Sequence, residues 1–240
     1  MAKNELNQNS KLTEEFTNTF EQNFKYVNNP INRFDVSKDN TTKNLLKKAE
    51  KLARLKEQIN SIENCNLKKN SHSLIMGDGN VNSPIMIIGE APGKEEDQTG
   101  ICFQGEVGKL LRKMFNAINI KLDDLYLSYA INFMTPDDRK PTSQEIKRYS
   151  SFLKEHITII DPKIIVLMGS TAMESLTGLN RGISKERGKW NEIILENNTL
   201  SYIITFSPSY LIRFPEYKKY SWEDLKMIRQ KIHDLNLKIK

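Results

Sequence analysis

The stretch PIMIIGEAPGKEEDQTGICFQGEVGKLL, residues 84–111, contains the pattern from which the fold can be worked out. Its first six residues form a continuous apolar run, which is typical of a strand buried on both faces. The run ends in Gly-Glu-Ala-Pro-Gly, a rigid turn whose backbone can approach a ligand closely. A helix with one apolar stripe is expected to start at Val107. The question is why a glutamate, Glu90, stands where a buried strand stops.

The same order of strand and helix recurs along the chain. Further apolar runs predict strands over 125–133, 163–169 and 200–206, and helices are expected over 141–160, 170–178 and 221–235. The last and the first of these helices open with capping-box patterns, Ser221 to Asp224 and Thr142 to Glu145. Repeated strand–helix units predict a three-layer α/β/α fold around a central, mostly parallel four-stranded sheet.

In such folds ligands bind beyond the carboxyl ends of the parallel strands. The segments that follow the four predicted strands are rich in polar residues, Gly and Pro: EAPGKEED, NFMTPDDRK, GSTA and SPSYLIR. We therefore expect these four segments to converge on one rim of the sheet and to form the binding site.

The N-terminal part of the chain has a different composition. Residues 1–42 form a polar, Asn-rich extension, expected to be partly helical or disordered, and residues 43–240 form the main domain. Apolar residues recur at helical spacing within the extension, at Phe16, Phe20, Phe24 and Val27. Residues 28–44 are expected to be a linker, and a second helix is expected over 43–62. The Phe stripe either docks on the domain, stays partly disordered, or recruits a protein partner.

Composition limits the classes of function. The net charge of +6 and pI of about 9.1 permit an anionic partner such as nucleic acid without requiring one. Two cysteines indicate a reducing compartment without a disulfide framework, and the three histidines show no zinc-ligand spacing. With no signal-peptide pattern and no run long enough to span a membrane, we expect a cytoplasmic monomer without a membrane partner.

Three side chains at the rim each have two interpretations. Glu90 is either a cap for the next turn or a functional carboxylate. Phe103 lies between glycines and is either a core residue or a platform on which a flat ligand stacks. Asn132 follows a buried strand, and its amide either caps a turn or reads the edge of a base, since it offers both a donor and an acceptor.

Several motifs together resemble the family 4 uracil-DNA glycosylases, which usually carry an iron–sulfur cluster. The first is GEAPGKEED followed by G-x-x-F-x-G-x-x-G-x-L-L, and the others follow in the family's order: RKPTSQEI, PKIIVLMGSTA, RGKW and TFSPSYLIR…WEDL. GDGN precedes the first strand, as in the family. The resemblance covers roughly residues 45–235.

The resemblance implies a role for each matching residue. Glu90 corresponds to the glutamate near the attacking water and the sugar, Phe103 to the side chain that stacks on the flipped uracil, and Asn132 to the one that reads its O4 and N3–H. The loop around the glutamate corresponds to the family's water-activating and uracil-binding loop: Gly89, Ala91, Pro92 and Gly93.

The closing motif corresponds to the segment that enters the minor groove beside the lesion. Pro208 and Ser209 are then expected to contact DNA, with Leu211 as a wedge and Arg213 as a phosphate contact. The partner that the resemblance implies is DNA containing uracil.

The sequence departs from the family in two places. The positions that match the four cluster cysteines are Ile62, Cys65, Phe133 and Tyr149, so we expect no cluster, no metal and no other cofactor, with Cys65 as a vestige. The family's catalytic histidine is replaced by Ser207, whose hydroxyl can donate a hydrogen bond but is never cationic. Losing one such donor typically costs about 10²–10³ in rate.

Three hypotheses follow. The first is an active N-glycosylase that removes uracil from DNA and leaves an abasic site, with Glu90 and Ser207 as catalytic residues. The second is a catalytically weak or inactive DNA-binding accessory protein. The third is an enzyme that acts on another base or on RNA.

Overall fold

The structure is a computed structural model, and it describes residues 36–239 of the chain, with side chains from residue 45 onward. The chain divides into two units, Met1–Asn44 and Leu45–Lys240. The predicted helix around Phe16 to Val27 lies outside the described residues. The predicted domain boundary after residue 42 stays a prediction. The predicted linker is wrong from Val36 onward, because helix α2 (Val36–Asn60) begins there.

A mixed six-stranded sheet forms the centre of the Leu45–Lys240 unit, in the order β1-β3-β2-β4-β6-β5. The inner strands β3, β2, β4 and β6 are parallel, and β1 and β5 run antiparallel at the two edges. The bounds are β1 (Gly77–Gly79), β2 (Ile85–Gly89), β3 (Tyr126–Tyr129), β4 (Ile164–Met168), β5 (Trp190–Leu195) and β6 (Asn198–Thr205). The three-layer α/β fold is confirmed, with six strands where four were predicted.

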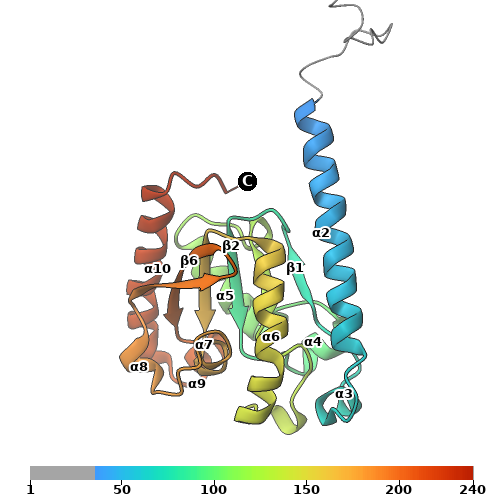
Figure 1. Cartoon of the computed structure of the whole chain (residues 1–240). Coiled ribbons are helices and arrows are strands. Elements are labelled where there is room, and N and C mark those ends of the chain that lie inside the picture. The colour runs from blue at the N-terminus through green and yellow to red at the C-terminus, as the bar shows by residue number, and fades with distance from the viewer. Residues whose placement is uncertain (1–35, 240) are drawn as a thin grey trace, which may run out of the picture. The chain divides into compact units, whose positions relative to one another are not determined.

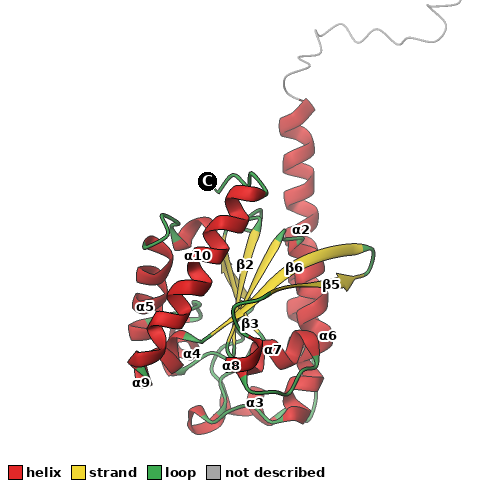
Figure 2. Cartoon of the chain, turned by 90° about the vertical axis from the view of Figure 1, so that its left-hand side faces the viewer, coloured by secondary structure: helices red, strands yellow, loops and turns green. Residues whose placement is uncertain are grey.

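The remaining helices connect the strands and cover both faces of the sheet (Figures 1 and 2). They are α3 (Asn66–Asn70), α4 (Lys94–Thr99), α5 (Gly105–Asn116), α6 (Ser143–Ile160), α7 (Ser170–Thr177), α8 (Ile183–Glu186), α9 (Pro208–Arg213) and α10 (Lys218–Asp234), with short 3-10 turns at η1 (Leu122–Asp124), η2 (Pro136–Asp138) and η3 (Pro215–Tyr217). None of the helices between residues 36 and 239 combines the length and the apolar composition needed to cross a membrane.

Alternate side chains along the strands pack into two separate hydrophobic cores, one on each face of the sheet. Ile87 and Val166 pack with α5 and α10 on one face, whereas Ile88 and Leu167 pack with α6 and α7 on the other. Every residue of β2 and β4 is buried, as the continuous apolar runs predict. Figure 2 shows α5 and α10 on the opposite side of the sheet from α6.

The two capping-box predictions have opposite outcomes. At Thr142 the box is confirmed, because the Thr142 hydroxyl accepts from the Glu145 backbone N–H and Glu145 accepts from that of Thr142. At Ser221 it is wrong, because α10 begins three residues earlier, at Lys218. Asp224, which was expected to close the box, is fully buried and instead accepts hydrogen bonds from Arg187 and from the Thr205 hydroxyl.

A second buried polar group predicts how stability depends on pH. His156 on α6 is hydrogen-bonded to the Tyr126 hydroxyl (2.9 Å), and burial lowers the pKa of its imidazole to about 3. Below the ordinary pKa of about 6.5 the unfolded chain therefore binds a proton that the folded chain does not. Stability is retained above that pH and is lost as the pH falls, by about 1.4 kcal/mol per unit down to the folded pKa.

We expect His156→Gln to remove this dependence. Urea unfolding of both proteins at several pH values between 7 and 4 measures it. The variant has a lower stability at pH 7, but its stability is expected to change less steeply than that of the parent as the pH falls. Parallel curves for the two proteins would contradict the assignment.

Candidate active site

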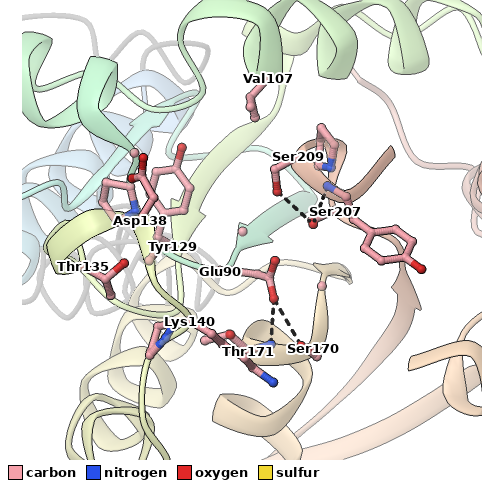
Figure 3. A pocket seen from close by; sticks show the side chains of 18 of the residues that line it. Glu90, Val107, Tyr129, Thr135, Asp138, Lys140, Ser170, Thr171, Ser207 and Ser209 are labelled. Carbon is pink, nitrogen blue, oxygen red and sulfur yellow. Dashed lines mark hydrogen bonds between the residues drawn. The ribbon is translucent and has the colours of Figure 1, made fainter. Parts of the chain in front are cut away.

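The carboxyl ends of the four parallel strands border one cavity of about 490 Å³. Each strand contributes the residues that follow it, so the predicted convergence on one rim is found (Figure 3). The lining residues include Gly89 to Gly93 at the end of β2, Thr135 and Asp138 to Pro141 after β3, Gly169 to Thr171 after β4, and Phe206 to Tyr210 after β6.

Glu90 is held at this rim by the start of another helix. Its Oε1 accepts from the Thr171 backbone N–H (3.1 Å) and from the Ser170 hydroxyl (3.4 Å). These groups begin α7, and the positive end of a helix stabilises a carboxylate. The second carboxylate oxygen points toward Ser207 and Ser209 (Figure 3). Glu90 thus caps a helix, although not the next turn along the chain, and still presents one oxygen to the cavity.

The Glu90 carboxylate fits in its place because residue 169 is a glycine. The residue has a φ of +106°, and a Cβ atom placed there would overlap the Glu90 side chain. A glycine between β4 and α7 is therefore required both by the backbone and by the position of Glu90.

Phe103 lines the cavity from a strained backbone. Its φ of +51° is rare for a residue with a side chain, and its ring stacks on Tyr129 with centroids 4.7 Å apart. The Phe103 backbone N–H donates to the Tyr129 hydroxyl (2.9 Å). Glu96 accepts from the backbone N–H groups of Gly93 (2.9 Å) and Gln104 (2.8 Å). This carboxylate joins the Glu90 loop to the Phe103 segment.

Ser207 is buried at the start of α9. Its hydroxyl oxygen accepts from the Tyr210 backbone N–H (3.3 Å) and lies 3.1 Å from the Ser209 hydroxyl oxygen. One of the two hydroxyls therefore donates to the other, which leaves one hydroxyl proton of the pair outside this hydrogen bond. Both serines line the cavity opposite Glu90 (Figure 3).

Two of the sequence-predicted site residues lie elsewhere. Asn132 is 4% exposed, does not border the cavity, and donates from Nδ2 to the Ile75 carbonyl (2.9 Å). Leu211 is 1% exposed and packs in the core with α5 and α10. In this conformation Leu211 cannot act as a wedge, and the exposed apolar side chains of this segment are Ile212 and Phe214.

The other predicted residues border the cavity: Gly89, Glu90, Ala91, Pro92, Gly93, Phe103, Ser207, Pro208, Ser209 and Arg213. Residues that sequence reasoning did not name also line it, among them Tyr129, Ser170, Thr171, Arg139 and Lys140. Their segments follow predicted strands, which indicated that the segments would border the site. The sequence did not show which residues of each segment would face the cavity.

The four positions that match the family's cluster ligands come together as a packed core. The Cys65 sulfur lies 3.2 Å from the Tyr149 hydroxyl, the Tyr149 ring contacts Phe133 edge to face, and Ile62 packs against the same cluster. Cys65 is the one thiol of the four. No group of three or more His, Cys, Asp or Glu side chains in the described part of the chain could hold a metal ion. These residues do not fit a four-thiolate cluster.

Known proteins resemble this chain over most of its Leu45–Lys240 unit. Residues 76–226 match the model of the uracil DNA glycosylase superfamily. The chain is 34% identical to the type-4 uracil-DNA glycosylase of Thermotoga maritima over 158 residues, which cover 65% of this chain and 81% of that protein. It is 32% identical to the type-4 uracil-DNA glycosylase of Sulfurisphaera tokodaii over 75% of this chain and 84% of that protein.

A third relative is of another kind. The chain is 29% identical to a DNA polymerase of Bacillus phage SP01 over 163 residues, 68% of this chain and 17% of that protein. The resemblance to family 4 seen in the sequence is confirmed by the type-4 relatives. With its cavity at the ends of the parallel strands and the superfamily match across most of the domain, the chain belongs to the uracil-DNA glycosylase superfamily.

Proposed function

We propose that the protein is a DNA repair N-glycosylase that removes uracil from DNA by hydrolysing the N-glycosidic bond and leaves an abasic site. One observation carries the proposal: the Glu90 carboxylate is fixed through one oxygen and presents the other across the cavity to Ser207 and Ser209. The names of the type-4 relatives support uracil as the base.

The chemistry requires the target nucleotide to leave the base stack and enter the cavity. Phe103, backed by Tyr129, offers a ring face on which a flipped base stacks. As the bond between the sugar C1′ and uracil N1 breaks, positive charge builds on the sugar and negative charge on uracil. Glu90 stabilises the first charge and accepts a proton from the water that attacks C1′. The two serines carry two hydroxyl protons. One lies in the hydrogen bond between Ser207 and Ser209, and the other is donated toward the departing base.

Asn132 remains the proposed reader of uracil O4 and N3–H. Its amide nitrogen has two N–H groups, of which one is used on the Ile75 carbonyl. Since Asn132 does not border the cavity, this role requires the side chain to turn toward the base when the base enters.

DNA contacts are proposed for basic side chains at the mouth of the cavity. Lys140 and Arg213 are exposed and line it, and cations there suit the phosphates on either side of a flipped nucleotide. Arg139 also lines the cavity, but its guanidinium is paired with Glu145. Pro208 and Ser209 belong to the same DNA-facing segment. We further propose that the protein acts as a monomer in the cytoplasm, where its two buried free thiols stay reduced. The extension of residues 1–42 is the proposed site for a protein partner.

The function is tested with a labelled oligonucleotide containing one uracil, opposite guanine, opposite adenine, and single-stranded. Alkali after incubation cuts the strand at abasic sites. Cleavage that is retained through purification and lost in Asn132→Ala supports the proposal. No cleavage at a large excess of protein over DNA would overturn it.

A second candidate function is a DNA-binding accessory protein of low or no activity. It is favoured by the hydrogen bonds that already occupy Ser207, at the position of the family's histidine, and Asn132. Binding of uracil-containing DNA that weakens with added salt, without any cleavage, is the result that this alternative predicts.

We also infer that the domain folds without an iron–sulfur cluster. Tyr149 is fully buried among the residues that replace the ligands, and burial raises the pKa of its hydroxyl. Tyr149→Ala would leave a cavity in this core and is expected to lower the free energy of unfolding by about 3–5 kcal/mol. Urea unfolding measures the change.

The neighbouring Phe152→Ala serves as the control, since Phe152 is half-buried at the edge of the same cluster and its loss is expected to cost less. Iron analysis of the parent protein accompanies the measurement. Stoichiometric iron in protein purified without added metal would contradict the inference.

A further inference from the structure

A ladder of aromatic rings runs from the cavity onto the surface. Tyr210 lies 4.8 Å from Phe214 and 5.3 Å from Tyr217, measured between ring centroids, and Tyr217 lies 6.0 Å from Tyr220. The inner end of the ladder is anchored by Phe206, which is buried and stacks on Tyr210 at 5.1 Å with nearly parallel planes. We call Tyr210, Phe214, Tyr217 and Tyr220 the aromatic ladder.

The ladder is open to solvent at its outer end and continuous with the proposed active site at its inner end. Phe214 is 43% exposed and Tyr220 is 42% exposed. Tyr210 and the neighbouring Arg213 line the cavity itself. The ladder therefore borders one way out of the cavity.

The charges around the ladder suit a polyanion. Between Phe206 and Trp222 the sequence has three basic residues, Arg213, Lys218 and Lys219, and one acidic residue, Glu216. The Lys219 ammonium lies 5.0 Å from the centroid of the Tyr220 ring. The Arg187 guanidinium lies 5.5 Å from the same centroid, but its charge is paired with Asp224. Cations beside exposed rings are the combination that binds phosphates and stacks bases of unpaired strands.

We propose that the aromatic ladder binds the unpaired bases of single-stranded DNA next to the nucleotide held in the cavity. This inference rests on the proposed function and adds a preference for single-stranded substrate. Bases in a duplex stack on one another and present no free faces to protein rings, whereas every unpaired base has a face available for stacking. The ladder is thus expected to matter for single strands and not for duplexes.

The test uses the full chain and a fluorescent oligonucleotide without uracil, single-stranded or annealed to its complement, with affinity measured by anisotropy. Base–aromatic stacking predicts that Phe214→Ala combined with Tyr220→Ala weakens single-strand binding by at least about tenfold. Duplex affinity is expected to change by less than about threefold. Tyr220→Phe keeps the ring and is expected to keep the parent's affinity.

Trp222→Ala is the matched control, because Trp222 is 40% exposed on the same helix as Tyr220 and is not in the ladder. Thermal unfolding verifies that each variant is folded. If the double variant is not folded, it is replaced by Tyr220→Leu. Leucine keeps apolar bulk but has no aromatic face. Unchanged single-strand affinity, or an equal loss on both forms of DNA, would overturn the proposal.

Binding to DNA without uracil separates this proposal from the proposed function. Ladder-dependent binding without any excision would leave the ladder standing and remove the glycosylase assignment. If the protein excises uracil but its single-strand affinity is the same in the parent and the ladder variants, the glycosylase assignment stands and the ladder proposal falls.

Discussion

Glu90→Gln is expected to lower the rate of uracil excision by about 10²–10⁴, the range typical for loss of a positioned general base. Glutamine keeps the shape of the side chain and an oxygen that can accept from the Thr171 backbone N–H. It removes the negative charge that faces the forming positive charge on the sugar. Single-turnover excision at saturating protein measures the chemical step directly.

The matched control is Glu95→Gln, which removes an exposed carboxylate five residues along the same segment. Its excision rate is expected to equal that of the parent. Affinity for DNA should be retained or increased in Glu90→Gln, because a negative charge that would repel the DNA phosphates has been removed. A Glu90→Gln rate within threefold of the parent's would rule out the proposed role of this carboxylate.

Gly169→Ala is expected to reduce excision by about 10², although residue 169 needs no contact with the substrate. A methyl group there overlaps the Glu90 side chain and must push it from its place on α7. Displacements of about 1 Å in a catalytic group can cost this much. Combined with Glu90→Gln, the substitution should cause little further loss, since both act through the same carboxylate.

Gly178→Ala is the control that separates displacement of the Glu90 side chain from the effect of backbone strain on the excision rate. Gly178 ends the same helix with a φ of +74°, and a Cβ atom there meets nothing within 4 Å. Gly178→Ala should lose about 1–2 kcal/mol of stability because its backbone is left-handed. Gly169→Ala should lose about 1–3 kcal/mol, because its φ of +106° and ψ of 169° lie in a region essentially restricted to glycine. Only Gly169→Ala should lose activity. Equal excision rates for the two would show that Glu90 tolerates displacement.

The sequence predicts the parallel part of the fold because burial on both faces leaves an unmistakable pattern. The runs at β2 and β4 are continuously apolar, and the polar segments that follow them converge as expected. The edge strands give no such signal. β1 is the three-residue Gly77–Gly79, and β5 has mostly exposed or half-buried positions, so that neither has a face that must be apolar.

The site could be predicted to the level of segments and the residues that match motifs. It could not be predicted that α7 holds Glu90, because that contact joins residues about 80 positions apart. Leu211 shows a related limit. Its place in a motif suggested a wedge, whereas helix α9 turns this side chain into the core and turns Ile212 outward. Which way a side chain faces depends on tertiary packing that a motif does not encode.

The packed core of Ile62, Cys65, Phe133 and Tyr149 has a consequence for the conditions in which the protein matures. Ile62, Phe133 and Tyr149 offer no thiolate to bind iron, and Cys65 is the one thiol among the four. On the inference that the domain binds no cluster, this part of it can form whatever the supply of iron. Oxidants that dismantle iron–sulfur centres find no inorganic target among these four side chains. A repair protein built in this way would keep its fold during the oxidative stress that damages DNA.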